Sequence, residues 1–230
     1  MEEKIIKQIF EKVSACISLK PVPEFEELAT VKAIDGRKVG SVSVYQGDKI
    51  ERYTFTDLSL APGMNYFSIT IRPTSMYNIP KLGINYMQTP DQIQFDVDLY
   101  PAVDLVPRQE YVDKYYDLLK ETFLQAKSAP YFSWRVSDHS WMRVNASPYF
   151  FMSRTDIAHK DLVDLLVQAY LDVWLKIHAE AQAVSEEEAR LIASRRSWLD
   201  RWLREREPDR HVIVKIFGEE LTNKMSDAMI

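Results

Sequence analysis

The feature that most constrains the fold is a run of strand-like segments between residues 31 and 99, separated only by short turns. The segments are rich in β-branched and aromatic residues and span 39–45, 50–55, 66–71, 84–87 and 93–99. Gln46-Gly47-Asp48 and Thr89-Pro90-Asp91 supply turn residues between neighbouring segments. Because strands joined by short turns pair with their neighbours, the pattern predicts an antiparallel sheet.

Helical patterns lie before and after this run. They span residues 1–17, 111–123, 161–183, 185–206 and 212–230, and two further strand-like segments span 134–144 and 148–153. Ser185 and Glu188 form a capping box at the start of one helix, and Pro208 ends it. Helices placed on both sides of the strand run predict a three-layer α/β/α sandwich with a central antiparallel sheet. With 6 glycines and scattered prolines, the chain shows no linker, so we expect one domain over 1–230.

Composition and missing motifs exclude several classes of protein. A net charge of -5 argues against general binding of nucleic acid. The single Cys16 excludes an internal disulfide and a thiolate cluster. No signal peptide or membrane-spanning stretch is recognisable, so we expect a cytoplasmic protein. Nucleotide-binding glycine loops and close histidine pairs are also missing. If this chain is a redox enzyme, the missing motifs imply that it holds no cofactor of its own and takes electrons from a partner protein.

Three segments in the second half of the chain carry a more specific pattern. Tyr77–Asn85 leads into Gln94–Pro101, Ser147–Arg154 forms a second motif, and Pro208-Asp209-Arg210 with Lys215–Glu220 forms the third. In order and spacing they resemble the motifs of the ferredoxin-dependent bilin reductases. The resemblance covers Tyr77 to Ile230. The stretch Asp98–Val106 is also similar to the red chlorophyll catabolite reductases of the same superfamily.

The resemblance implies a substrate, a mechanism and an electron source. A bilin, most simply biliverdin, would lie between the sheet and the C-terminal helices. Reduced ferredoxin, or flavodoxin in its place, would deliver single electrons, so the reaction would pass through bilin radicals. Acidic side chains with pKa values raised by burial would supply the protons.

The resemblance also assigns roles to individual residues. The acid of the family's first motif falls on Asn85, which has no acidic proton and can only orient the pigment by hydrogen bonds. The second acid falls on Asp209, with His211 as a secondary candidate. A histidine and a glutamate found in members that transfer four electrons fall near Ser68 and Thr56. These departures favour a two-electron reduction.

Further residues are candidates for contact with the substrate. Arg154 and Arg210 would pair with the propionates, since arginine binds carboxylates bidentately. Ser147 and Ser68 are the other substrate-binding candidates. Each residue also has a structural interpretation: Asn85 as a turn residue, Asp209 as a helix N-cap, and the arginines and His211 as surface groups. Asp96 and Asp98 alternate with apolar residues, so they face either solvent or the pigment.

Six arginines crowd the helix predicted over 185–206 and its end. They are Arg190, Arg195, Arg196, Arg201, Arg204 and Arg206. One interpretation is a solvated face paired with Asp200, Glu205 and Glu207. The other is a docking surface for acidic ferredoxin, where opposite charge speeds the encounter.

Three functions remain open from the sequence. The first is a ferredoxin-dependent reductase of biliverdin with Asp209 as acid and Asn85 as orienting group. The second is a reductase of a bilin from chlorophyll breakdown. Enzymes of that kind, which this chain resembles, carry a glutamate near the position that Asn85 occupies here, and this difference weakens the second function. The third is a bilin-binding protein without catalysis, consistent with the missing first acid.

Overall fold

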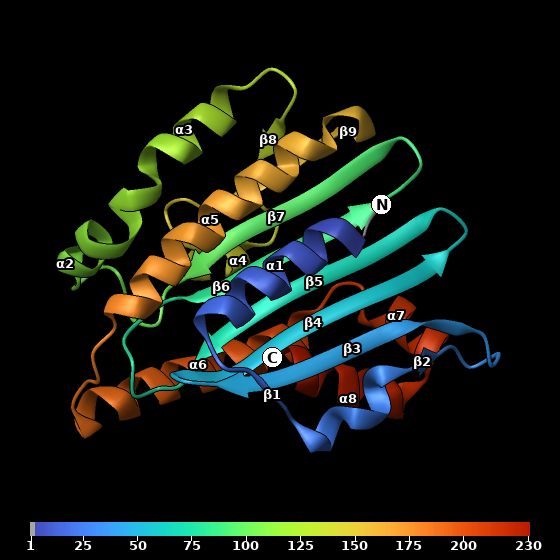
Figure 1. The fold of residues 1–230 in the computed structure, drawn as a ribbon, viewed down its shortest axis with the longest axis horizontal. Coiled ribbons are helices and arrows are strands. Elements are labelled where there is room, and N and C mark those ends of the chain that lie inside the picture. The colour runs from blue at the N-terminus through green and yellow to red at the C-terminus, as the bar shows by residue number, and fades with distance from the viewer. Residues whose placement is uncertain (1–2) are drawn as a thin grey trace.

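A nine-stranded antiparallel sheet forms the centre of the molecule in the computed structural model, which describes residues 3–230 (Figure 1). The strand order is β1-β3-β4-β5-β6-β7-β9-β8, and β2 pairs with β3. The strands are β1 (Lys20–Pro21), β2 (Val31–Lys32), β3 (Lys38–Gly47), β4 (Ile50–Ala61), β5 (Met64–Pro73), β6 (Lys81–Gln88), β7 (Gln92–Tyr100), β8 (Ser133–Arg135) and β9 (Phe151–Asp156). The predicted antiparallel sheet is confirmed.

Three helices cover one face of the sheet. They are α1 (Glu3–Cys16), α3 (Lys120–Ser128) and α5 (Lys160–Glu180). The inward residues of the central strands are apolar here, and the main core contains Tyr53, Tyr86, Phe95 and Trp174, all fully buried. The indole nitrogen of Trp174 donates to the carbonyl of Pro80 at 2.9 Å, so this buried polar group is satisfied.

The segment leading into α3 is helical but irregular. It begins with α2 (Gln109–Tyr111) and passes through a π-helical turn, η2 (Val112–Tyr116), and a 3₁₀ turn, η3 (Asp117–Leu119). The hydroxyl of Tyr116 donates to the carbonyl of Leu99 at 2.7 Å, which fastens this segment to the end of β7. The helix predicted over 111–123 is therefore present with interruptions.

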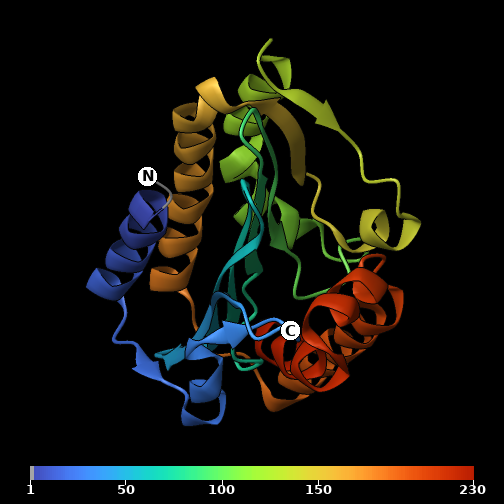
Figure 2. The ribbon, with the colours of Figure 1, turned by 90° about the vertical axis from the view of Figure 1, so that its right-hand side faces the viewer.

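The opposite face carries α4 (Ser140–Asn145), α6 (Glu186–Arg206), α7 (Arg210–Phe217) and α8 (Glu219–Met229). Figure 2 shows the sheet edge-on, with α1 and α5 on one side and the C-terminal helices on the other. The 3₁₀ segment η1 (Pro23–Ala29) lies below them. A second, smaller core joins β2–β4 to α7 and α8 through residues such as Val42, Leu58, Phe217 and Met225. Both faces are thus covered, as predicted.

Three local predictions need correction. Residues 140–145 form α4 rather than a strand, because Ser147 is bonded to Asp98 and holds the preceding loop outside the sheet. The last helix is two helices, since Gly218 has φ of 79° and turns the chain between α7 and α8. The capping box is present in half: Ser185 accepts from the amide of Glu188 at 3.2 Å, but the Glu188 carboxylate bonds to Asn78 instead.

One further short element completes the chain. The 3₁₀ turn η4 (Ile157–His159) joins β9 to α5, and Asp156 caps it by accepting from the amide of Ala158 at 2.8 Å. Within residues 3–230, no helix is both long and apolar enough to cross a bilayer.

Candidate functional site

A row of side chains crosses the sheet on the face of α6–α8. Strand register places Thr56 opposite Ser68, Ser68 opposite Asn85, and Asn85 opposite Asp96. Side chains directly opposite one another in an antiparallel sheet share a face. Thr56 and Ser68 are buried, whereas Asn85 and Asp96 are half-buried. The row therefore places polar groups of four neighbouring strands within the layer between the sheet and the C-terminal helices.

Hydrogen bonds link the centre of this row. The Asn85 amide nitrogen donates to Oδ1 of Asp96 at 2.9 Å, and the Tyr66 hydroxyl donates to Oδ1 of Asn85 at 3.2 Å. Burial raises the pKa of Asp96 to about 6, against the effect of the bond from Asn85. Asp96 is therefore an acid that carries its proton close to neutral pH, beside a side chain that orients it.

A second buried carboxylate, Asp98, lies two residues further along β7. It accepts the amide of Ser147 at 2.9 Å and the hydroxyl of the same residue. Burial raises the pKa of Asp98 to about 7, although these bonds oppose the rise. Asp98 is completely buried, so its visible role is to tie the loop after α4 to the sheet. Ser147, a candidate for substrate binding, uses both its hydroxyl and its amide to donate hydrogen bonds to Asp98.

The corner between α6 and α7 holds Asp209 and His211. Asp209 is exposed and occupies the N-cap position of α7, but its side chain makes no capping bond. Its amide donates to Oε1 of Glu207 at 3.2 Å. Burial raises the pKa of Tyr66 to about 12, and the charges of Asp96 and Glu207 add to that rise. The corner therefore lies within electrostatic reach of the row, while His211 turns to the carbonyl of Pro208 at 3.1 Å.

The two arginine candidates lie in different surroundings. Arg154 on β9 is exposed, pairs with Gln94 on β7 and donates to that side chain at 3.1 Å. Since Gln94 and Asp96 are two apart on one strand, Arg154 shares the face of the row. Arg210 instead donates to Glu219 at 2.6 Å and to Asn223 at 2.8 Å on α8. Both bonds use Nη2 of Arg210, so its Nε and Nη1 would be the donors for a substrate carboxylate.

Sequence reasoning left two members of the row without a role. Asp96 was placed on a face that could be solvent or substrate, and the structure places it against Asn85 with a raised pKa. The three-residue turn between β6 and β7 sets the register that places Asp96 opposite Asn85, and that register is the sequence signal for this pair. The hydroxyl of Thr56 is buried with no hydrogen-bond partner among the described residues. Nothing in the sequence pointed to that.

The six arginines also separate in space. Arg196 is buried, and Asp200 pairs with Arg72 of β5 rather than with a neighbour on α6. Arg204 pairs with Asp227 of α8, and Arg190 pairs with Glu186 at 3.9 Å. The predicted pairing along the helix with Asp200 is therefore wrong, because that carboxylate turns toward the sheet.

Comparisons with known proteins define the class of this fold and site. The family model for ferredoxin-dependent bilin reductases matches residues 6–228. Two phycoerythrobilin:ferredoxin oxidoreductases of Prochlorococcus marinus are similar in sequence. The one from strain MIT 9301 is 22% identical over 173 residues, covering 74% of this chain and 68% of its own length. The one from strain MIT 9215 is 21% identical over 176 residues, covering 72% and 66%.

The fold matches a solved structure even more completely. Phytochromobilin synthase from tomato, crystallised in complex with biliverdin, superposes with a TM-score of 0.87 at 18% identity. The match covers 98% of this chain and 81% of that one. The class is thus an α/β/α sandwich with polar and acidic side chains on the inner face of its sheet. By the family match over nearly all its length, this chain belongs to the ferredoxin-dependent bilin reductases.

Proposed function

We propose that this protein reduces biliverdin by two electrons, taken one at a time from reduced ferredoxin. The observation that carries the proposal is the Asn85–Asp96 pair, an orienting amide bonded at 2.9 Å to an acid whose pKa is raised toward neutrality. The biliverdin bound to the tomato enzyme of the same fold supports the choice of substrate. Thr56, with its unpartnered hydroxyl, supplies a further polar contact on the same row.

The reaction needs two electrons and two protons. Two ferredoxins are oxidised, one carbon–carbon double bond of the pigment becomes a single bond, and each of its carbons gains one hydrogen. We assign one proton to Asp96, which faces the pigment layer from the sheet. We assign the other to Asp209, which is exposed at the α6–α7 corner on the same side of the sheet. A positioned acid of suitable pKa contributes about 10²–10⁴-fold to such a proton transfer.

The remaining candidates hold and orient the pigment in this proposal. Asn85 orients the pigment through its carbonyl or pyrrole groups, and Ser68 lines the row beside it. Arg154 binds a propionate from the open end of the row, since its guanidinium is exposed. Arg210 supports the site by its hydrogen bond to Asn223 on α8, and Ser147 supports it by its hydrogen bond to Asp98. His211 is an alternative proton carrier at the α6–α7 corner.

Ferredoxin would dock on the exposed arginines of α6 and its end. Arg190, Arg201 and Arg206 are exposed on α6. Opposite charges across an interface speed association and make it sensitive to salt. The expected result is a ferredoxin-dependent rate that falls steeply with ionic strength. An equal rate across salt concentrations would contradict docking through these charges.

The proposal is tested by an anaerobic absorption time course with biliverdin, before and after adding ferredoxin and a reducing system. We expect the bound pigment to pass through a transient radical band to a blue-shifted product. The product's retention time then identifies the reduced bond. A bound pigment that stays unchanged under reduced ferredoxin would overturn the proposal. A red chlorophyll catabolite would be the next substrate to test, and failure with it would favour a binding protein.

Two variants separate the proposed acids. With Asp96→Asn or Asp209→Asn, the protein should still bind biliverdin and accept a first electron, but one proton transfer should fail and the radical should accumulate. Electron paramagnetic resonance measures that radical. Asp161→Asn, an exposed acid at the start of α5 on the opposite side of the sheet, is the matched control. Wild-type turnover in both acid variants would remove them from the mechanism.

A further inference from the structure

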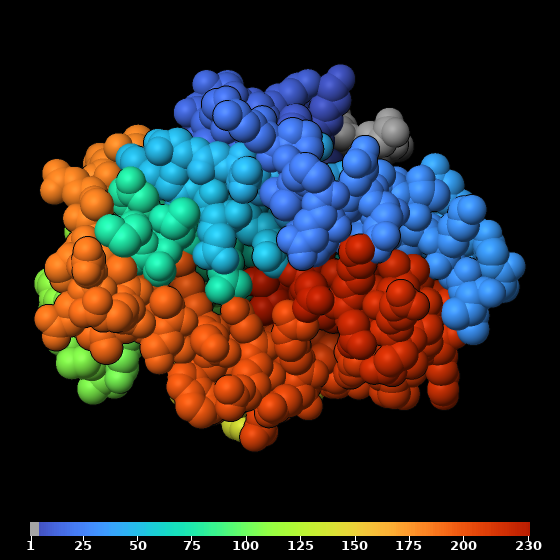
Figure 3. Space-filling model, turned by 90° about the horizontal axis from the view of Figure 1, so that it is seen from below, coloured from blue at the N-terminus to red at the C-terminus, as the bar shows by residue number. Residues whose placement is uncertain are grey.

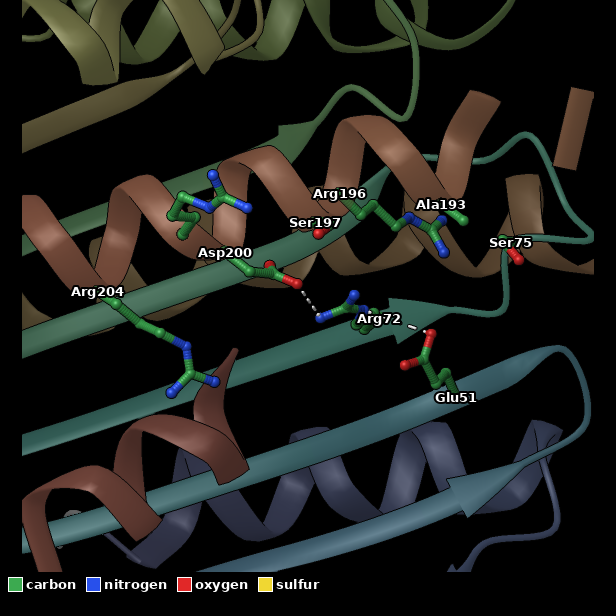
Figure 4. A pocket seen from close by; sticks show the side chains of 9 residues that line it. Glu51, Arg72, Ser75, Ala193, Arg196, Ser197, Asp200 and Arg204 are labelled. Carbon is green, nitrogen blue, oxygen red and sulfur yellow. Dashed lines mark ion pairs between the residues drawn. The ribbon is translucent and has the colours of Figure 1, made fainter. Parts of the chain in front are cut away.

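A cavity of about 570 Å³ lies where α6 meets the ends of β4 and β5. Its charged lining consists of Glu51, Arg72, Arg196, Asp200, Arg201 and Arg204. Figure 4 shows these groups from α6 and from the two strands approaching one another. From below, α6 in orange borders the cyan and teal strand ends that contribute the rest (Figure 3). The volume is within the range of small-molecule sites, about 300–1,000 Å³.

Charge in this cavity is unbalanced. Four arginines line it, against two carboxylates. Both carboxylates serve Arg72, whose Nη1 lies 2.9 Å from Asp200 and whose Nε lies 3.4 Å from Glu51 (Figure 4). Arg204 has Asp227 of α8 as its partner. The lining thus keeps a positive excess, located at Arg196 and Arg201.

Arg196 is the least satisfied of these groups. Its side chain is only 7% exposed, and its Nη1 donates to the carbonyl of Pro73. Its Nη2 is buried with no hydrogen-bond partner among residues 3–230. Burial lowers the pKa of Arg196 to about 10, and the nearby charge of Arg72 adds to that effect. A buried guanidinium with a free donor is costly unless an anion completes it.

We propose that this cavity binds a small molecule carrying a doubly charged anionic group, either a phosphate ester or a pair of carboxylates. Arginine guanidiniums bind phosphate and carboxylate through paired hydrogen bonds, and Arg196 both lines the cavity and keeps a donor without a partner among the described residues. Arg201, at the exposed side, supplies a second guanidinium. The inference rests on the cavity itself and stands whether or not the protein reduces a bilin.

The anion has two possible sources, which share this chemistry. A smaller hollow, lined by Lys81 and Tyr100, shares Arg72, Arg196 and Asp200 with the cavity. Asp96 and Asp98 both act electrostatically on Tyr100, so that hollow leads toward the polar row. The two propionates of a pigment on the row would be one source, in place of the contact with Arg154. A free phosphate-bearing metabolite would be the other.

Binding of inorganic phosphate to the whole protein, without any bilin, is the first test. Calorimetry at constant ionic strength, with chloride as the reference anion, should show saturable binding of one phosphate. Arg196→Met and Arg201→Gln should each weaken that binding about tenfold, the loss of a charge-assisted hydrogen bond. Arg190→Gln, on the same helix but outside the cavity, should bind like the wild type. Because Arg201 is exposed, its variant tests the site even if Arg196→Met fails to fold.

Biliverdin and its dimethyl ester distinguish the sources. If propionates occupy the cavity, biliverdin displaces phosphate, the diester does not, and Arg201→Gln weakens only the binding of the free acid. If the ligand is independent, phosphate affinity stays the same at saturating biliverdin. Either result supports the anion site. The proposal is overturned if wild-type protein shows no saturable phosphate binding, or if Arg190→Gln weakens it as much as the two cavity variants.

Discussion

Asn85 and Asp96 face each other across β6 and β7, with the amide of Asn85 donating to Oδ1 of Asp96 at 2.9 Å. The pair shows how a chain that lacks the expected acid on β6 can keep an acid at the same level of the sheet. The carboxyl group of Asp96 stands one strand over from Asn85, and neighbouring strands lie about 5 Å apart. Asn85 then becomes the group that orients it.

The pH dependence of turnover should report Asp96. Its pKa is raised to about 6, so the proton-bearing form dominates below that pH and is lost above it. We expect the rate of radical decay to be flat below about pH 6 and to fall toward tenfold per unit above it. Stopped-flow absorption across pH measures this rate. The same profile in Asp96→Asn would show that another group titrates.

Asn85→Asp should move this profile upward. Two carboxyl groups at hydrogen-bond distance resist double ionisation, so one of them keeps its proton to higher pH. The variant should therefore show radical decay that stays fast above pH 6, where the wild type slows. Asn85→Ser, which adds no acid but removes the amide that lowers the pKa of Asp96, is the comparison and should move the profile upward less than Asn85→Asp does. An unchanged profile in Asn85→Asp would mean that Asp96 is not the titrating group.

Asp98 should make the protein less stable as pH rises. Its pKa is about 7 in the folded protein and near 3.8 when unfolded. Between these values the folded chain holds a proton that the unfolded chain has released, so the free energy of unfolding falls with rising pH. It levels off above about pH 7. Between pH 4 and pH 8, the free energy of unfolding of Asp98→Asn should rise by about 2–4 kcal/mol relative to that of the wild type, because the variant lacks this titrating group.

Urea denaturation at several pH values measures that difference. Asp161→Asn is the control, because its side chain is exposed on the other face. Equal pH slopes in Asp98→Asn and the wild type would show that Asp98 keeps an ordinary pKa in the folded protein. The pH slope of Asp98→Asn must be compared with that of the wild type, because the raised pKa of Asp96 also makes the free energy of unfolding fall with rising pH.

Gly83 on β6 should not tolerate a side chain. A Cβ there would come within 2.6 Å of Cε2 of Tyr100, whose ring lies over the glycine. Gly83→Ala should cost about 1–3 kcal/mol of unfolding free energy and shift the absorption of bound biliverdin. Tyr100→Leu in the same chain should recover most of the stability, as a urea-denaturation cycle of both variants would show. If Tyr100→Leu recovers no stability in the Gly83→Ala chain, the strain does not come from contact with Tyr100.

The elements and the layers of this protein follow from its residue pattern alone. Alternation along β3–β7 and helical spacing in α1, α5 and α6 identify the central sheet and its covering helices, because burial of one face imposes those periods. The motifs with Asn85, Asp209 and Arg154 were sufficient to indicate the family. Residues 140–145 were misassigned because their fold depends on the distant bond between Ser147 and Asp98.

Which polar groups meet depends instead on how the strands and helices pack. The partner of Asn85 is set by strand register, and the partner of Asp200 is Arg72, more than a hundred residues away. The pKa of Asp96 and the unpartnered guanidinium nitrogen of Arg196 both follow from burial, which is a property of the packed layers. A sequence lists the charges of a chain, but only the fold determines which of them lose water and which find a partner.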